Sequence, residues 1–171
     1  MKISSTITLP YPYNLLRDIN ISDIDNPHLI DDIEQTVNSL TDKEQTLIRL
    51  RYKEGKTLKE SGDVIGVSKE YTRCLINNII WKIKHSYRYN KIVYGKMPGE
   101  YLGERPLTID DLDLSKRTYA LLSKSGCYEL KKLNGKTSSD KVFHRLRIGI
   151  KTLSDLNLQT EQYGVRVLIE D

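Results

Sequence analysis

The sequence predicts a mainly α-helical protein built of two small domains. Three observations lead to this prediction. Apolar residues recur at the i, i+3, i+4 spacing of helices over 28–85, and two Thr-x-x-Glu capping boxes open helices inside that stretch. A segment rich in Tyr, Gly and Pro then interrupts the pattern over 86–106 before a second series of helical spacings begins. A chain of 171 residues has room for two domains of this size.

The first element, residues 1–27, is expected to be an N-terminal arm of irregular structure. It contains Pro10, Pro12 and Pro27, and its polarity is mixed. Residues 1–39 carry two basic and six acidic residues, so the arm lies in the acidic part of the chain.

The second element, residues 28–86, is expected to be a helical domain. Leu29, Ile30, Ile33 and Val37 predict a helix over 28–39. A capping box over 41–44 then predicts the start of another helix, which ends at Gly55.

The second half of this domain predicts a helix-turn-helix. A capping box from Thr57 to Glu60 opens a short helix over 58–65, and Gly66 tolerates the left-handed conformation at its end. Ser68 is a plausible N-cap for a longer helix over 69–85. Ser61 and Gly62 supply the small residues needed where two helices cross. The apolar positions of the longer helix are expected to be buried, and they are Thr72, Leu75, Ile76, Ile79, Ile80 and Ile83.

The longer helix is the candidate DNA-contacting element, because the second helix of this motif enters the major groove. Lys69, Glu70 and Arg73 lie in its first turns, where Arg can donate two hydrogen bonds to guanine and Glu can accept from cytosine. Residues 69–96 carry seven lysines or arginines and one acid. The expected phosphate contacts are Lys59, Lys82, Lys84 and Arg88. An ordinary helical hairpin with a charged face is the competing interpretation.

Residues 40–85 resemble region 4 of bacterial primary sigma factors, the module that recognises the promoter -35 element. The resemblance rests on L-T-x-x-E-x-x-x-I-x-L-R-Y over 40–52 and G-x-T-L-x-E-x-G-x-x-x-G-V-S-x-E-x-x-R over 55–73. It implies base contacts at Lys69, Glu70, Arg73 and Cys74, where Cys74 replaces a glutamine and therefore implies a different preferred sequence. It implies a phosphate contact at Thr57. Asn77 lies on the same side of the predicted helix as Lys69 and Arg73, so it is also a candidate DNA-binding residue. Because only 39 residues precede the module in this sequence, we expect a chain that is not a complete sigma factor.

The third and fourth elements are a linker over 87–105 and a second domain over 106–171. The linker has few aliphatic residues and no helical period, so we expect it to be irregular or partly extended. The apolar positions of the second domain predict four or five short helices, and the β-branched tail over 164–169 predicts a short strand or a packed arm.

The second domain resembles the C-terminal domain of the RNA polymerase alpha subunit. The resemblance rests on I-D-D-L-D-L-S-K-R over 109–117 and on L-R-I-G-I-K-T-L over 146–153, a helix–hairpin–helix signature. It implies minor-groove binding to A/T-rich DNA and contact with sigma region 4. Gly149 is expected to permit a turn whose N–H groups face a phosphate. The implied DNA contacts are Arg117, Arg147, Gly149, Lys151 and Thr152. Ala120 departs from the family's usual asparagine, and a packing domain without DNA binding is the alternative.

Several classes of protein and site are excluded or disfavoured. No apolar run approaches the ~20 residues needed to span a bilayer. Two cysteines exclude a disulfide-rich scaffold and a four-thiolate metal site, and favour a reduced, cytoplasmic setting. Asp110, Asp111 and Asp113 suit a first helical turn better than catalysis or a metal site. No phosphate-binding loop or nucleophile motif occurs, so we expect no enzyme, no cofactor and no metal.

The sequence therefore predicts a non-enzymatic, sequence-specific DNA-binding transcription regulator. Its expected partner is double-stranded promoter DNA with a -35-like site and adjacent A/T-rich DNA, in the cytoplasm of a bacterial or phage-infected cell, near the nucleoid. Contact with the RNA polymerase core or sigma, and a homodimer, stay open. The alternative is a sigma and alpha mimic that acts mainly by protein–protein contact with polymerase. A DNA-repair accessory is a weaker third class.

Overall fold

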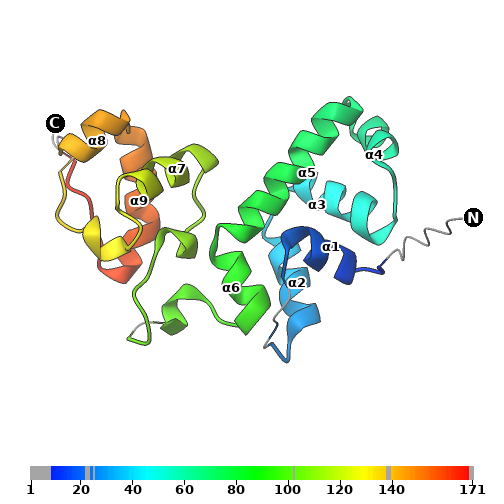
Figure 1. Cartoon of the computed structure of the whole chain (residues 1–171), viewed down its shortest axis with the longest axis horizontal. Coiled ribbons are helices and arrows are strands. Elements are labelled where there is room, and N and C mark those ends of the chain that lie inside the picture. The colour runs from blue at the N-terminus through cyan, green and yellow to red at the C-terminus, as the bar shows by residue number, and fades with distance from the viewer. Residues whose placement is uncertain (1–8, 22–23, 25, 102, 138–139, 170–171) are drawn as a thin grey trace, which may run out of the picture. The chain divides into compact units, whose positions relative to one another are not determined.

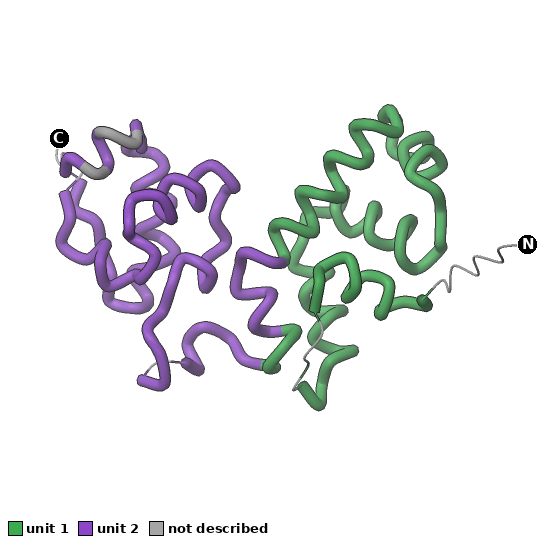
Figure 2. The backbone as a smooth tube through the Cα atoms, in the orientation of Figure 1, with its two compact units in different colours: residues 1–83, 92–95 green, residues 84–91, 96–171 purple. Residues whose placement is uncertain are grey.

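The computed structural model describes the whole chain except residues 1–8, 22–23, 25, 102, 138–139 and 170–171 (Figure 1). The described residues are mainly helical and contain no β-strand, only two isolated β-bridges, so the predicted fold class is confirmed. None of the described helices is long and apolar enough to cross a membrane. The chain divides into two compact units (Figure 2). Unit 1 comprises residues 1–83 and 92–95, and unit 2 comprises 84–91 and 96–171.

Unit 1 is a set of short helices around an aliphatic core. Its helices are α1 (Tyr13–Ile19), α2 (Leu29–Asn38), α3 (Asp42–Ile48), a π-helical turn (Arg49–Lys53), α4 (Leu58–Ile65) and α5 (Lys69–Lys84), of which α5 reaches one residue into unit 2. Its largest fully buried side chains are Leu15, Ile19, Ile33, Leu47, Ile48, Leu50, Ile79, Ile83 and Ile92. The predicted capping box after α2 forms, because the Glu44 carboxylate accepts the Thr41 backbone N–H at 2.9 Å.

The prediction of an irregular N-terminal arm is wrong for residues 13–19, which form α1; residues 1–8 of that arm lie outside the described structure. Leu15, Leu16 and Ile19 are at most 3% exposed, so α1 belongs to the core of unit 1. Seven residues are too few for a helix to be stable alone, and α1 therefore depends on this burial.

Polar side chains attach α1 and the residues before it to the π-helical turn. The Asn14 amide donates to the Tyr52 carbonyl at 2.9 Å, and the Tyr52 hydroxyl donates to Asp18 at 3.0 Å. The Tyr11 hydroxyl and the Lys53 ammonium both donate to Glu34, at 2.8 and 2.7 Å. The hydrogen bond from Lys53 keeps the pKa of Glu34 below its usual value despite partial burial. Asp18 and Glu34 of the acidic N-terminal part are thus bound by side chains within unit 1.

The prediction of a linker without helical structure is wrong for residues 87–94, which form α6 (Tyr87–Tyr94). Arg88 is 2% exposed, while Ile92 and Val93 are at most 3% exposed. The helix contributes Arg88 to unit 2 and the two aliphatic residues to unit 1. A buried arginine takes a position where an apolar residue would have revealed the helical period, so the sequence pattern concealed this helix.

Where the sequence predicted four or five short helices over 106–171, the described residues of that range form three α-helices and three short 3₁₀ turns. The α-helices of unit 2 beyond α6 are α7 (Lys116–Lys124), α8 (Lys141–Leu146) and α9 (Ile150–Thr160). The 3₁₀ turns of unit 2 are Pro98–Tyr101, Ile109–Asp111, Leu130–Lys132 and Glu161–Tyr163. Phe143, Leu122 and Leu153 lie in one apolar core with Val165 and Val167 from the tail. The tail is therefore a packed arm, held by an isolated bridge between Thr137 and Leu168 and by hydrogen bonds such as those between Asn157 and Val167.

Two arginines attach the predicted linker segment to carboxylates of unit 2. Arg88 forms a pair of hydrogen bonds with Asp113, including one of 3.0 Å from Nη2 to Oδ2. Arg105 donates to both oxygens of Asp111, at 2.6 and 2.9 Å. The Asp111 side chain is fully buried, and it also accepts the Thr108 backbone N–H. Arg88 was an expected phosphate contact; its burial on Asp113 contradicts that prediction.

Candidate nucleic-acid interface

The helix-turn-helix forms as the sequence predicts, through local hydrogen bonds at each boundary. Thr57 and Glu60 form the reciprocal capping box, with the Glu60 N–H donating to the Thr57 hydroxyl at 3.2 Å. Gly66 ends α4 in the left-handed conformation, at φ +73°. The Ser68 hydroxyl accepts the Tyr71 N–H at 3.2 Å, which satisfies one free donor at the start of α5. These contacts fix the turn without help from distant residues.

Small residues allow α4 to cross the first turns of α5 closely (Figure 1). A Cβ on Gly62 would lie 2.6 Å from the Thr72 hydroxyl and 2.6 Å from the Val67 carbonyl oxygen. Ser61 is fully buried and donates its hydroxyl to the Thr57 carbonyl at 2.9 Å. The predicted role of the two small residues is therefore confirmed by the contact distances.

We expect Gly62→Ala to lower the free energy of unfolding of unit 1 by about 1–3 kcal/mol, the usual cost of overpacking a core. Chemical denaturation followed by the fluorescence of Trp81, the single tryptophan, measures this change. Gly66→Ala is the matched control, since it has a positive φ but open space around its Cβ and should cost about 1–2 kcal/mol from backbone strain alone. Thr72→Ala should rescue Gly62→Ala only in part, because the Val67 carbonyl would still clash. Complete rescue would contradict this explanation.

The α5 helix has one buried stripe and one exposed face. Thr72, Ile76, Ile79 and Ile83 are at most 6% exposed. Leu75 and Ile80, which the sequence predicted to be buried, are half-buried because they lie at the two edges of the stripe. The stripe fixes the rotation of the helix about its axis and so determines which side chains face outward.

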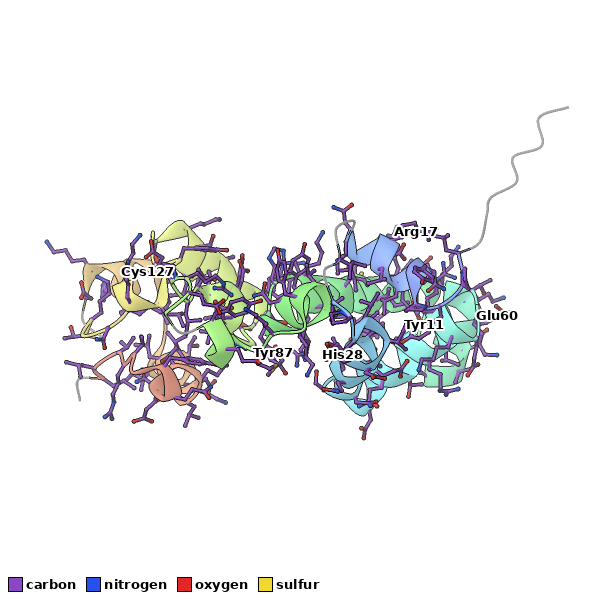
Figure 3. All side chains as sticks on the ribbon, turned by 90° about the horizontal axis from the view of Figure 1, so that it is seen from below. Tyr11, Arg17, His28, Glu60, Tyr87 and Cys127 are labelled. Carbon is purple, nitrogen blue, oxygen red and sulfur yellow. The ribbon has the colours of Figure 1, made fainter. Side chains whose placement is uncertain are left out.

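All the candidate residues of the helix-turn-helix are exposed. They are Thr57, Lys69, Glu70, Arg73, Cys74 and Asn77. Thr57 uses its hydroxyl as the N-cap acceptor of α4, next to Glu60, which Figure 3 labels. Within the described part of the chain, Lys69, Glu70 and Arg73 take part in no salt bridge. Tyr71 and Asn78 are also exposed on α5, and the same helical period could have marked them as candidates.

Several other cations of unit 1 pair with carboxylates. Lys82, an expected phosphate contact, pairs with Glu44 at 3.4 Å, and Lys53 pairs with Glu34. Arg49 and Lys56 both pair with Glu54. Lys69 and Arg73 at the start of α5 are thus cations of unit 1 that form no salt bridge among the described residues. An anionic ligand could bind them without displacing a carboxylate.

The candidate residues of unit 2 lie at the starts and ends of its helices. Arg117 is exposed in the first turn of α7, and Arg147 is exposed at the end of α8. Gly149 is the N-cap residue of α9, whose first turn carries the exposed Lys151 and the half-buried Thr152. Arg117, Arg147 and Lys151 form no salt bridge among the described residues. The structure thus places three of these residues, Gly149, Lys151 and Thr152, at one helix start.

The expected turn at Gly149 is formed differently. Gly149 has φ −78° and ψ 160°, an extended conformation that any residue adopts. The left-handed residue between α8 and α9 is Arg147, with φ 51°. Apart from its two chain neighbours, no described residue has an atom within 4 Å of a Cβ built on Gly149, so its small size leaves open space beside the α9 N-terminus rather than permitting a turn.

The three acidic residues near the start of unit 2 are engaged internally. Asp111 and Asp113 bind Arg105 and Arg88, and Asp110 lies 3.7 Å from His85 Nδ1. No group of three or more His, Cys, Asp or Glu side chains in the described ranges is arranged to hold a metal ion. Their partners lie up to 25 residues earlier in the chain, and no local sequence signal marks such pairs.

Comparison with known proteins matches one part of the chain. The family model for sigma-70, region 4 matches residues 37–85, which include α3, α4 and α5. No curated protein and no solved structure matches the chain. The match covers the helix-turn-helix described above and none of unit 2 beyond residue 85. Residues 37–85 are therefore similar to sigma-70 region 4, a non-enzymatic, DNA-binding helix-turn-helix family of transcription.

Proposed function

We propose that this chain is a sequence-specific DNA-binding transcription regulator. In this proposal α5 enters the major groove of a -35-like promoter site, and Lys69, Glu70, Arg73, Cys74 and Asn77 face the base edges. Thr57 contacts a phosphate. The observation that carries the proposal is that Lys69 and Arg73, at the start of a helix in a segment similar to sigma-70 region 4, are exposed and form no salt bridge with the residues that the structure describes.

Unit 2 provides a second contact in the same proposal, as an alpha C-terminal-like domain. Arg117, Arg147 and Lys151 bind the phosphates or minor groove of adjacent A/T-rich DNA, with Gly149 and Thr152 beside the α9 N-terminus. Linking two weak DNA-binding modules in one chain raises the effective concentration of the second once the first is bound. The three cations are exposed and form no salt bridge within the described ranges, which supports this role.

The two cysteines of the chain allow a direct test. Cys74 is exposed on the proposed DNA face, and Cys127 is 3% exposed in unit 2 (labelled in Figure 3). We expect duplex DNA at about ten times its Kd to slow alkylation of Cys74 by N-ethylmaleimide about tenfold, because only free protein reacts. Peptide mass spectrometry measures both thiols, and Cys127 serves as the internal reference. An unchanged Cys74 rate on duplexes selected from a random library would contradict major-groove binding through α5.

A mimic of sigma and alpha that binds RNA polymerase is the second candidate function. The similarity of residues 37–85 to sigma-70 region 4 favours it, since that module contacts the polymerase core. Retention of purified core polymerase by the immobilised chain in the absence of DNA would support it. In that case Lys69→Ala and Arg73→Ala would leave retention unchanged while DNA binding fell.

A further inference from the structure

We infer that Asn77 recognises an adenine in the target site. This inference rests on the proposed function, because it assumes that α5 faces the bases. It concerns the base sequence of the target, which the proposed function leaves open.

The direction of Asn77 on the helix is the first argument. At about 100° per residue, Lys69, Glu70, Arg73 and Cys74 spread over an arc of about 140° around α5. Asn77 falls within about 10° of the middle of this arc, whereas the neighbouring Asn78 falls about 110° from it. Asn77 therefore points where the proposed base-contacting residues point.

The state of the side chain is the second argument. Asn77 is exposed and has no hydrogen-bonding partner among the described residues, so its donor and acceptor are both available. Its backbone is held in place, because the flanking Ile76 and Ile79 are 6% and 1% exposed. A carboxamide on a rigid helix can donate to adenine N7 and accept from adenine N6 in one plane. Cys74 offers only a weak thiol donor and cannot form this pair of bonds.

The rise of the helix gives the expected position of the adenine. Four residues separate Arg73 from Asn77, which is about 6 Å along the axis of α5. Successive base pairs are about 3.4 Å apart, so the adenine is expected within about two base pairs of the pair that Arg73 contacts, a limit reached when α5 runs along the stacking direction.

Selection of duplexes from a random library by three full-length proteins tests the inference. The wild-type chain should enrich an A·T pair at one position of the site. Asn77→Ala should reduce this enrichment about tenfold or more and keep the G·C preference at the pair that Arg73 contacts. Asn78→Ala is the matched control: both asparagines lie about 130° from the buried stripe, and only Asn77 lies on the proposed base-contacting arc. Both changes put alanine at an exposed helical position, which favours the fold.

A second probe identifies the contacted atom. Replacing that adenine with 7-deazaadenine removes the N7 acceptor and should weaken wild-type binding about tenfold while leaving Asn77→Ala unaffected. An unchanged base preference in Asn77→Ala would overturn the inference, as would an equal loss for all sequences, which marks a phosphate contact. If the wild-type chain selected no sequence at all, the proposed function itself would fail, so the two failures are distinguishable.

Discussion

Replacing Arg105 with alanine is expected to lower the free energy of unfolding of unit 2 by about 3–5 kcal/mol, the usual cost of leaving one partner of a buried ion pair uncompensated. The side chain of Asp111 is fully buried, and it accepts two hydrogen bonds from Arg105. The remaining donors, from Thr108 and Asn90, are neutral and cannot balance the carboxylate charge. The hydrogen bonds that Arg105 donates to Asp111 raise the pKa of Arg105, so its guanidinium stays charged.

Hydrogen exchange of the backbone amides of α7 and α9 measures this loss within unit 2. Lys96→Ala is the control, since it removes the same charge from an exposed pair with Glu104 and should leave exchange unchanged. Combining Arg105→Ala with Asp111→Asn should restore most of the stability, because no buried charge is then left alone. Equal amide exchange rates in Arg105→Ala and Lys96→Ala would show that the pair of Arg105 and Asp111 does not stabilise unit 2.

The helix-turn-helix could be predicted because its signals are local. The capping box at Thr57, the left-handed Gly66 and the N-cap Ser68 each act within four residues, and each forms as expected. The buried stripe of α5 follows from helical spacing alone. Once the stripe is known, the exposed face is known too, which is why all the candidate residues on α5 are exposed.

The elements that the sequence did not predict depend on contacts between distant residues. α1 is held by burial of three aliphatic side chains and by hydrogen bonds to Tyr52, 34 or more residues away. α6 carries a buried Arg88 that is stable only because Asp113 lies opposite. Helical periodicity is read over a short stretch of sequence, and that stretch does not include Tyr52 for α1 or Asp113 for α6. A buried arginine also has the hydropathy of a surface residue, so hydropathy does not reveal its burial.

The same limit applies to the candidate site. The charge excess over 69–96 counted Lys82 and Arg88 as available cations, yet both bind carboxylates. Lys69 and Arg73 carry no such pairs among the described residues. The net charge of a segment therefore overestimates the number of cations available to bind DNA. That number depends on which cationic side chains are already paired with carboxylates.

The double change Lys69→Ala with Arg73→Ala is expected to weaken binding to the selected duplex by about 2–4 kcal/mol, or about 30-fold to 1,000-fold, since a good base contact contributes about 1–3 kcal/mol. Fluorescence anisotropy at fixed salt measures the Kd. The matched control is Arg49→Ala with Lys53→Ala, which removes the same charge from unit 1 but at residues already paired with Glu54 and Glu34. Affinity for the selected duplex in this control should stay within about threefold of wild type, the scale of a screened surface charge.

The salt dependence of binding then separates base contact from general attraction. If Lys69 and Arg73 bound only phosphates, removing them would lower the slope of log Kd against log salt by about 1.8 and weaken all duplexes alike. If they contact bases, the slope changes less and the loss is confined to the selected sequence. Equal losses in the double variant and in the paired control would mean that the chain attracts DNA through net charge alone. That outcome would remove α5 as the recognition helix and leave polymerase contact as the remaining function for residues 37–85.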